Sequence, residues 1–456
     1  MTLRRLRRGG PVGRPIAPVR LAHLGLGNFF RAHQAWYTEH SEDGPDWGIA
    51  AFGGRGGEAA ALLEAQDGLY TLVTREPTGD HMETVSVISK AYPAADSEAW
   101  LRTLADPSVV AVTATVTEAG WHGSPQGGLA VGHSEVVSDV EALRAGQPGA
   151  VATAPGRLVA GLAARWQDGS PPLTVIPCDN IPGNGPLVRR VLTELAGMID
   201  ANLAQWIDAE VGVVGCVVDR ITPHTVDADR LAVAEATGLD DRSPVVTEPF
   251  SEWIMSGTFV LGRPKWESAG VRLVEDLEPY EHRKLRLLNG GHSLLAYFGL
   301  ARGHTAVVEA LGDEMCAEWL HRWWGEASRH LEQPAEEIEG YTSQLLRRMA
   351  NPRLADRLLR IAEDGSQKLP IRVLPVLRLE RLEGRSAEAA AAVLAAWILH
   401  LRSGRKVADP RAAELVALAA GPPERAVPAV LGALDPALAE DVEVGELVRE
   451  QLALFA

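Results

Sequence analysis

Cysteine is scarce in this chain, with three residues among 456. Cys178, Cys216 and Cys316 lie far apart and match no zinc-binding spacing, and their odd number argues against a disulfide framework. No apolar run approaches the roughly 18 residues that a membrane span requires. Basic residues are outnumbered 44 to 60, and the formal net charge of −16 opposes binding to nucleic acid or anionic lipid. We therefore expect a protein of the reducing cytoplasm that binds neither nucleic acid nor membranes.

A chain of 456 residues is too long for one ordinary hydrophobic core, so two or three domains are expected. Residues 1–15 are rich in arginine and lack the apolar core of a signal peptide, which predicts a disordered basic tail. Near Pro279 the pattern changes to long helical periods without a convincing strand. The sequence thus predicts a strand-containing domain over 16–278 and a mostly helical domain over 279–456.

A glycine-containing turn follows the first predicted strand, at 19–24. A strand, two close glycines and the start of a helix are typical of a turn that receives the pyrophosphate of a dinucleotide. Such a pair of glycines is also common in ordinary turns, and Phe30 stands where the third glycine of the usual fingerprint would be. The residues expected to contact the cofactor are Gly25, Gly27, Asn28 and Phe29.

The second predicted strand, 47–52, lacks the acidic residue that normally follows it and binds the ribose hydroxyls. A glycine-rich loop with Arg55 follows instead. Arg55 would suit the 2′-phosphate of NADP, although an arginine in such a loop is also commonly solvated, so NAD and NADP both remain open. A β-branched strand at 109–116 leads to Glu118, which we expect near the cofactor at the carboxyl edge of the sheet.

Two later strands also end in polar residues. The strand at 173–177 leads to Asp179 and Asn180, and the strand at 211–218 leads to Asp219. These positions suggest a site at one edge of the sheet, but turn capping explains the same residue types equally well.

A helix near 280–293 carries the strongest chemical pattern. At about 100° per residue, Lys284, Asn289 and His292 fall at about 0°, 140° and 80° on the helix, and Glu281 lies on the same side. If apolar neighbours keep this surface dry, desolvation would lower the pKa of Lys284 toward neutrality and make it a base; a solvated lysine is the ordinary alternative. Glycines 290 and 291 indicate a close approach to the helix backbone, by another helix or by a ligand.

Taken together, these motifs resemble the long-chain polyol dehydrogenases, the group that includes mannitol 2-dehydrogenase and fructuronate reductase. They stand in the family's order over about three quarters of the chain. The resemblance implies an α/β fold, with an N-terminal Rossmann-type doubly wound sheet followed by a mostly α-helical C-terminal domain, and hydride transfer without a metal. The segments that carry it are 25–34, 66–71, 178–185, 218–223 and 284–293.

The resemblance also implies roles for individual residues. Lys284 matches the general base, Asn180 and Asn289 match the amides that hold the reacting oxygen, and Glu281 matches a carboxylate in the path of the proton. The residues that match polar or basic groups around the substrate are His292, Asp219, Arg360 and Lys368. The family's ribose-binding aspartate has no counterpart here, which puts an NAD preference in doubt.

The expected activity is zinc-independent hydride transfer between NAD or NADP and a secondary alcohol of a polyol or sugar acid, of the mannitol/fructose or mannonate/fructuronate type. A monomer or weak homo-oligomer is expected. One alternative is a mannitol-1-phosphate-type dehydrogenase in which Arg360 and Lys368 bind phosphate. Another is a sensor that binds nicotinamide cofactors but no longer reacts.

Overall fold

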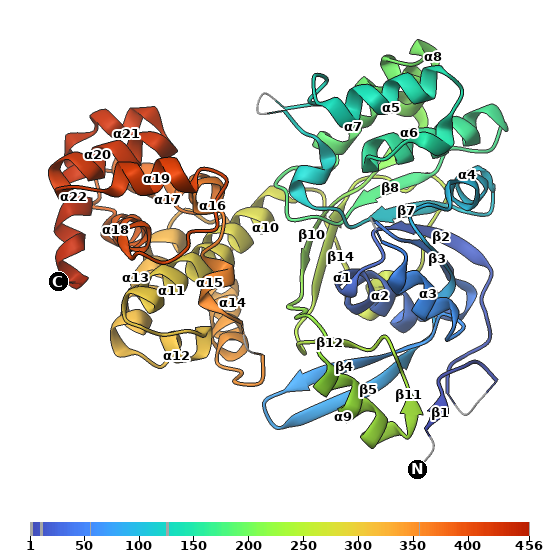
Figure 1. Cartoon of the computed structure of the whole chain (residues 1–456), viewed down its shortest axis with the longest axis horizontal. Coiled ribbons are helices and arrows are strands. Elements are labelled where there is room, and N and C mark those ends of the chain that lie inside the picture. Colours follow the sequence, from blue (N-terminus) through green and yellow to red (C-terminus); the bar gives the residue numbers. More distant parts are fainter. Residues whose placement is uncertain (1–2, 10–11, 55, 125–126, 355, 456) are drawn as a thin grey trace. The chain divides into compact units, whose positions relative to one another are not determined.

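The computed structural model describes residues 3–9, 12–54, 56–124, 127–354 and 356–455. The chain forms two compact units, Met1–Glu278 and Pro279–Ala456 (Figure 1). The units are joined where the sequence changes to long helical periods. Among the described residues, every helix is too short or too polar to cross a bilayer.

A six-stranded parallel sheet forms the centre of the first unit. Its strands run in the order β6-β3-β2-β7-β8-β9, so the first strand along the chain lies between the second and the fourth. This is the order of a doubly wound nucleotide-binding sheet, which confirms the predicted fold class. The strands are β2 (Val19–Leu24), β3 (Gly48–Phe52), β6 (Ile88–Tyr92), β7 (Ala111–Ala114), β8 (Thr174–Pro177) and β9 (Gly212–Val213).

Both faces of this sheet are covered, because alternate residues of its strands enter two separate cores. On β3, Ile49 and Ala51 belong to one core and Ala50 and Phe52 to the other. The first core is shared with α1 (Asn28–Ala32), α2 (Gln34–His40) and α3 (Glu58–Glu64). The second is shared with α4 (Ser97–Ala105), α5 (Ser134–Arg144), α6 (Ala154–Gln167), α7 (Asn184–Gly197) and α8 (Ala201–Glu210).

The other strands of this unit form smaller sheets, and α9 (Asp227–Thr237) accompanies them. The first of these sheets contains β12 (Val245–Thr247), β4 (Tyr70–Glu76) and β5 (Gly79–Val85). The second contains β10 (Gly215–Asp219), β13 (Glu252–Ser256) and β14 (Arg272–Leu273). Short 3-10 turns lie at η1 (Gly44–Asp46), η2 (Glu118–Trp121), η3 (Pro148–Ala150) and η4 (Trp266–Ala269).

The strand predicted over 211–218 is divided between two sheets. Its first part, β9, ends the parallel sheet, whereas its second part, β10, pairs antiparallel with β13. The side chain of Asn184 explains the break, because it accepts from the backbone N–H of Cys216 at 3.0 Å and donates to the carbonyl of Cys216 at 2.8 Å. These bonds replace those of a neighbouring strand at this point.

The N-terminal segment is held in place, which corrects the prediction of a disordered tail for the described residues of 1–15. Strand β1 (Arg4–Arg5) pairs in parallel with β11 (Leu239–Asp240). The guanidinium of Arg8 donates to the backbone carbonyls of Asp67 at 2.8 Å and Ile88 at 3.1 Å. Arg8, one of the arginines that suggested a solvated tail, therefore satisfies backbone acceptors far along the chain, a use that composition does not reveal.

The second unit is helical. Its bounds are α10 (Glu278–Arg283), the π-helix η5 (Lys284–Asn289), α11 (Gly290–Ala301), α12 (Val307–Leu311), α13 (Glu314–Ser328), α14 (Ala335–Met349), α15 (Leu358–Ile361), α16 (Gly365–Arg372), α17 (Leu374–Leu382), α18 (Glu388–Arg402), α19 (Ala412–Ala419), α20 (Pro423–Leu434), α21 (Pro436–Glu440), α22 (Val442–Leu452) and η6 (Ala453–Phe455). Helices α11 and α18 pack together at its centre, and residues 389–398 of α18 are all buried. The small alanine side chains of α18 allow the neighbouring helices to approach closely.

Candidate functional site

The turn after β2 has the geometry that its glycines predict. Gly25 has φ +110°, and the backbone N–H groups of Gly25 and Leu26 both donate to the carbonyl of Phe52 at 2.9 Å. A Cβ on Gly25 would lie 2.1 Å from the carbonyl oxygen of Thr115, whereas a Cβ on Gly27 would meet nothing closer than 3.7 Å. Gly25 is therefore required by the fold, and Gly27 leaves the backbone open to a ligand.

An aromatic stack explains why the third glycine is missing. Phe30 is fully buried and stacks on the imidazole of His23 with ring centroids 3.5 Å apart. The imidazole also hydrogen-bonds to the hydroxyl of Thr113 at 2.7 Å and to the carbonyl of Gly25 at 3.1 Å. Burial lowers the pKa of His23 to about 3, so the ring supports the turn as a neutral group.

Two further residues predicted to contact the cofactor lie at the start of α1. The side-chain carbonyl of Asn28 accepts from the guanidinium of Arg31 at 2.7 Å, and Arg31 in turn donates to the carbonyl of Ser243 at 2.6 Å. Phe29 stacks on His33 with ring centroids 5.0 Å apart. The structure thus fixes both side chains beside the turn, and their contact with a cofactor stays a prediction.

A cavity of about 440 Å³ opens at the carboxyl ends of β2, β3 and β7. Open α/β sheets bind dinucleotides at this edge, where the strand order reverses. Glu118 starts η2 between two lining residues, Thr117 and Gly120. Arg55, the predicted contact for a 2′-phosphate, lies outside the described residues. The lining residues are Leu24, Gly54, Thr115, Val116, Thr117, Gly120, His122, Glu135, Ala152, Thr153, Ala154 and Arg157.

The loop after β8 is organised by Asp179. Its carboxylate accepts from the backbone N–H of Val116 at 2.8 Å and from the indole N–H of Trp121 at 2.6 Å. Burial raises the pKa of Asp179 to about 7. Asn180, the predicted oxygen-holding amide, is the next residue and is exposed. The structural role that turn chemistry allowed for Asp179 is therefore present, and the contact of Asn180 with a substrate stays a prediction.

Asp219 is the last residue of β10 and lies opposite Glu252 of β13. It is buried. Because β10 has left the parallel sheet, the expectation that both polar strand ends share one sheet edge is wrong. The two strand ends are linked instead through Asn184, which donates to the carbonyl of Asp179 at 3.2 Å as well as bonding Cys216. Asn184 lies in segment 178–185, one of those that carry the resemblance, but the sequence did not indicate this linking role.

In the second unit, the predicted catalytic helix contains a π-helical turn. Lys284 is its first residue and Asn289 its last, and the N–H of the following Gly290 donates to the carbonyl of Leu285, five residues earlier. Because π-helical bonds join residues five apart, Lys284 and Asn289 lie closer to one line along the helix than the 140° expected for an α-helix. π-Turns are rare and frequently occur at functional sites.

Two tryptophans of α13 support this turn. The indole N–H of Trp323 donates to the carbonyl of Arg286 at 2.8 Å, and that of Trp324 donates to the carbonyl of Leu287 at 2.9 Å. A Cβ on Gly290 would lie 2.5 Å from the ring of Trp323. The close approach indicated by the glycines is therefore made by a packed helix.

The predicted base is buried: Lys284 is 8% exposed. His292 lies in α11 and Glu281 in α10, and both are half-buried. Leu287 and Leu288, also in η5, belong to the apolar core of the unit. Lys284 is therefore not a solvated surface lysine, and its role as a base stays a prediction.

The two predicted basic contacts lie near each other in sequence and differ in environment. Arg360 lies in the short helix α15, and its side chain is 56% exposed and paired with Asp356 at 3.1 Å. The ammonium of Lys368 donates to the carbonyl of Ile361 at 3.4 Å, and its helix α16 packs against η5. Lys368 is therefore on an element that contacts the catalytic turn, whereas Arg360 is already neutralised by a carboxylate.

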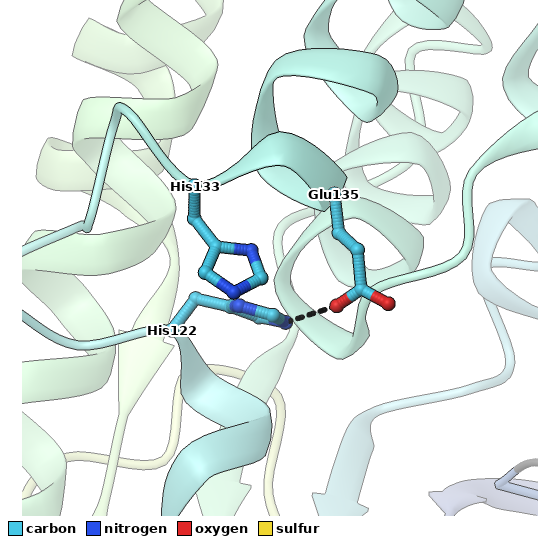
Figure 2. Close-up of side chains that lie close together, drawn as sticks. All are labelled: His122, His133 and Glu135. Carbon is cyan, nitrogen blue, oxygen red and sulfur yellow. Dashed lines mark ion pairs between the residues drawn. The ribbon is translucent and has the colours of Figure 1, made fainter.

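Near the cavity, His122, His133 and Glu135 point toward one another (Figure 2). Their potential ligand atoms all lie within 4.8 Å, a spacing that a metal ion could bridge. The imidazole of His122 pairs with the carboxylate of Glu135 at 3.6 Å, and that carboxylate is on the surface. The ion pair accounts for the approach of these two side chains.

The chain matches two family models in succession. The Mannitol dehydrogenase Rossmann domain covers residues 19–268, and the Mannitol dehydrogenase C-terminal domain covers residues 276–451. D-arabinitol 4-dehydrogenase of Ralstonia nicotianae is 38% identical over 373 residues, which are 79% of this chain and 78% of that protein. Mannitol 2-dehydrogenase of Cereibacter sphaeroides is 35% identical over 385 residues, 83% and 80% of the two chains.

Solved structures agree with these matches. The ternary complex of Pseudomonas fluorescens mannitol 2-dehydrogenase with NAD and D-mannitol has a TM-score of 0.82 and 31% identity, covering 98% of this chain and 99% of that chain. Substrate-free D-sorbitol dehydrogenase has a TM-score of 0.86 and 30% identity, covering 97% and 94%.

Together with the sheet order and the glycine turn, these matches define a nicotinamide-dependent oxidoreductase that acts on CH–OH groups. The chain belongs to the mannitol dehydrogenase family. The predicted resemblance, fold class and type of enzyme are confirmed.

Proposed function

We propose that this protein transfers a hydride between NAD or NADP and a secondary alcohol carbon of a polyol or sugar acid, with Lys284 as the general base. The observation that carries the proposal is the π-helix η5, which begins at a buried lysine and ends at Asn289. An amine and a carboxamide five residues apart on this turn can reach the same oxygen atom. The substrate hydroxyl would occupy that position.

Lys284 would remove the hydroxyl proton as the C–H bond breaks, and its ammonium form would return the proton in the reverse direction. The amides of Asn289 and Asn180 would donate to the oxygen as negative charge develops on it, which lowers the barrier more than it strengthens ground-state binding. Removing one such donor typically costs about 10²–10³ in rate. Metal-free polarisation of the substrate oxygen is thus within the reach of these side chains.

Other residues would orient the substrate and carry its proton. Glu281, three residues before Lys284, would relay the proton between the amine and solvent. His292 and Asp219 would hydrogen-bond to other hydroxyls of the substrate. Lys368 would bind the end of the substrate that is remote from the reacting carbon. Arg360 would join it after exchanging its pairing with Asp356 for a substrate group.

The first unit would hold the dinucleotide. The open backbone at Gly27 and the cavity at the ends of β2, β3 and β7 fit a pyrophosphate and an adenosine, respectively. When bound, the nicotinamide supplies the hydride acceptor or donor. The protein's contribution is to hold this ring and the substrate in position and to handle the proton.

The substrate we propose is a polyol or its ketose. Relatives are named for mannitol, arabinitol and sorbitol, three polyols that differ in length or in the configuration of a carbon. Sugar acids of the mannonate/fructuronate type remain candidates because Lys368 could pair with a carboxylate. A phosphorylated substrate is less well supported, since Arg360 already has an acidic partner.

The test is a set of polyols, ketoses and keto-uronates assayed with NADH and NADPH, using wild-type protein and Lys284→Ala. The variant should keep cofactor binding and lose about 10²–10⁴ in turnover, the usual contribution of a general base. Lys406→Ala is the matched control, because Lys406 is exposed in the same unit. Near-normal turnover of Lys284→Ala would remove the assigned base, and wild-type protein that binds cofactor without turning over any substrate would favour a sensor.

A further inference from the structure

Arg157 is a buried cation that the proposed function does not use, and it lines the cavity proposed to hold the adenosine. Arg157, in the first turn of α6, is 7% exposed and lines the cavity together with Gly54. Its Nη1 donates to the carbonyl of Gly53 at 3.0 Å. Gly53 directly follows β3, the strand whose end normally carries the acidic residue that binds the ribose.

The guanidinium of Arg157 is incompletely satisfied. Among the described residues, its Nη2 is buried without a hydrogen-bond partner, and its remaining neighbour of note is the ring of Trp100, 5.3 Å from its carbon centre. Burial lowers the pKa of Arg157 to about 10, so the side chain is still a cation at neutral pH. A buried cation is costly unless an anion compensates it, and no carboxylate is among the causes of this shift.

Arg165 shows what a purely structural arginine looks like on the same helix. Its guanidinium donates to three backbone carbonyls, those of Leu104, Asp106 and Pro171. Arg165 is fully buried and takes no part in lining the cavity. Arg165 also has a buried Nη2 without a hydrogen-bond partner among the described residues, so an unpaired nitrogen alone does not indicate a ligand. What distinguishes Arg157 is that it lines a cavity and has one backbone carbonyl in place of three.

We propose that Arg157 binds the 2′-phosphate of NADP(H) in this cavity and gives the protein a preference for NADP(H) over NAD(H). The inference rests on the proposed binding of a dinucleotide by the first unit. A carboxylate at the end of β3 would repel this phosphate, and glycines stand there instead. A planar guanidinium can form two parallel hydrogen bonds to phosphate oxygens, so the unpaired nitrogen gains a partner when the cofactor binds.

The rest of the cavity lining is compatible with this anion. Among the described lining residues Glu135 carries the one carboxylate, and His122 pairs with it at 3.6 Å (Figure 2). The imidazole of His133 lies beside that of His122, with ring centroids 4.6 Å apart. The one acidic group of the lining therefore already has a partner within it.

The first experiment compares two adenosine fragments on the wild-type protein by isothermal titration calorimetry. Adenosine 2′,5′-bisphosphate carries the phosphate that Arg157 would bind, and 5′-AMP lacks it. We expect the bisphosphate to bind roughly 10- to 100-fold more tightly, the range for a hydrogen bond to a charged group. Equal affinities would overturn the proposal and leave dinucleotide binding intact. Failure of both fragments to bind would overturn dinucleotide binding as well.

The second experiment measures KM for NADPH and NADH in three variants. Arg157→Gln should raise KM for NADPH by roughly 10- to 100-fold and leave KM for NADH within about threefold. Arg157→Lys keeps the positive charge but not the two parallel donors of the guanidinium, so it should retain part of the preference for NADPH over NADH. Arg165→Gln, the structural control, should lower thermal stability without altering the ratio of the two KM values. An equal change for both cofactors in Arg157→Gln would show that Arg157 is only structural.

Discussion

The indole N–H of Trp323 donates to the backbone carbonyl of Arg286 at 2.8 Å, in the middle of the π-helical turn that starts at Lys284. A Cβ on Gly290 would lie only 2.5 Å from the same ring. One tryptophan of α13 therefore both satisfies a carbonyl of η5 and requires a glycine after it. The unusual turn is a property of two packed helices and not of its own six residues.

Replacing Trp323 by Phe should weaken this turn. The carbonyl of Arg286 would lose its buried donor, which costs about 1–3 kcal/mol, and the amine of Lys284 would lose its fixed position. We expect a lower free energy of unfolding by urea titration and a fall in kcat larger than the change in KM. Trp319→Phe is the control, because Trp319 packs on Phe298 of α11, away from the π-helical carbonyls. Equal effects of both substitutions would assign the loss to general packing.

Alanine at position 290 should be destabilising even though alanine is the better helix former. Its Cβ would lie 2.5 Å from Trp323, and overpacking of this kind costs about 1–3 kcal/mol. Gly340→Ala in α14 gives the opposite control, since a Cβ there meets nothing within 4 Å and should stabilise by about 0.5–1 kcal/mol. Thermal unfolding of the two variants compares them directly. A stable Gly290→Ala protein with normal turnover would contradict the close packing.

The two glycines of the dinucleotide turn should respond differently to alanine. Gly25→Ala combines φ +110° with a Cβ 2.1 Å from the carbonyl oxygen of Thr115, so we expect loss of stability and of cofactor binding together. Gly27→Ala has room for its Cβ within the protein and should fold normally but bind cofactor weakly. Fluorescence titration with NADPH and thermal unfolding separate these outcomes. Undiminished binding by Gly27→Ala would show that the cofactor does not approach the backbone there.

Asp179 should make stability depend on pH in an unusual direction. Its pKa is about 7 in the folded protein against 3.8 for the ordinary carboxyl, so the folded state retains the proton longer. The stability that this group contributes is complete below about pH 4 and is lost as pH rises toward 7. At about 1.4 kcal/mol per pKa unit, the full difference approaches roughly 4 kcal/mol.

His23 has the opposite effect, because its pKa of about 3 in the fold lies below the ordinary 6.5. Its contribution is complete above about pH 6.5 and is lost as pH falls toward 3, so the two groups partly cancel in the wild-type protein. Asp179→Asn removes one of them. Urea titrations from pH 4 to 7 should therefore show stability rising with pH in the variant and changing less in the wild-type protein. Parallel curves would contradict the raised pKa of Asp179.

The sequence predicted those parts of the fold that are determined by neighbouring residues. The strand, turn and helix around Gly25, the β-branched strands of the parallel sheet and the change to helices near Pro279 all have strong periodicity, and the structure contains them. The division of 211–218 between two sheets was not predicted, because it depends on the side chain of Asn184, more than 25 residues earlier in the chain. The ordered N-terminal arginines were missed for the same reason: their acceptors are distant carbonyls.

In the candidate site, too, the sequence predicted local features and missed those that depend on distant residues. Lys284 was found from its spacing to Asn289 and His292, but the angles assumed an α-helix, and a π-turn cannot be read from residue types alone. The sequence features that accompany the π-turn are the glycines at 290 and 291 and the tryptophans of α13. Because the tryptophans lie more than 30 residues further along the chain, a local pattern does not link them to the glycines. Arg157 was missed entirely, because an arginine inside a helix is ordinary until its buried surroundings are known.

The carboxamide of Asn184 bonds the loop after β8 on one side and the backbone of β10 on the other. These hydrogen bonds join the main sheet to the smaller one, so the segments that carry Asn180 and Asp219 are held together by one side chain. A change of substrate preference during evolution could then exchange either of these polar residues for another without disturbing the alignment of the remaining one.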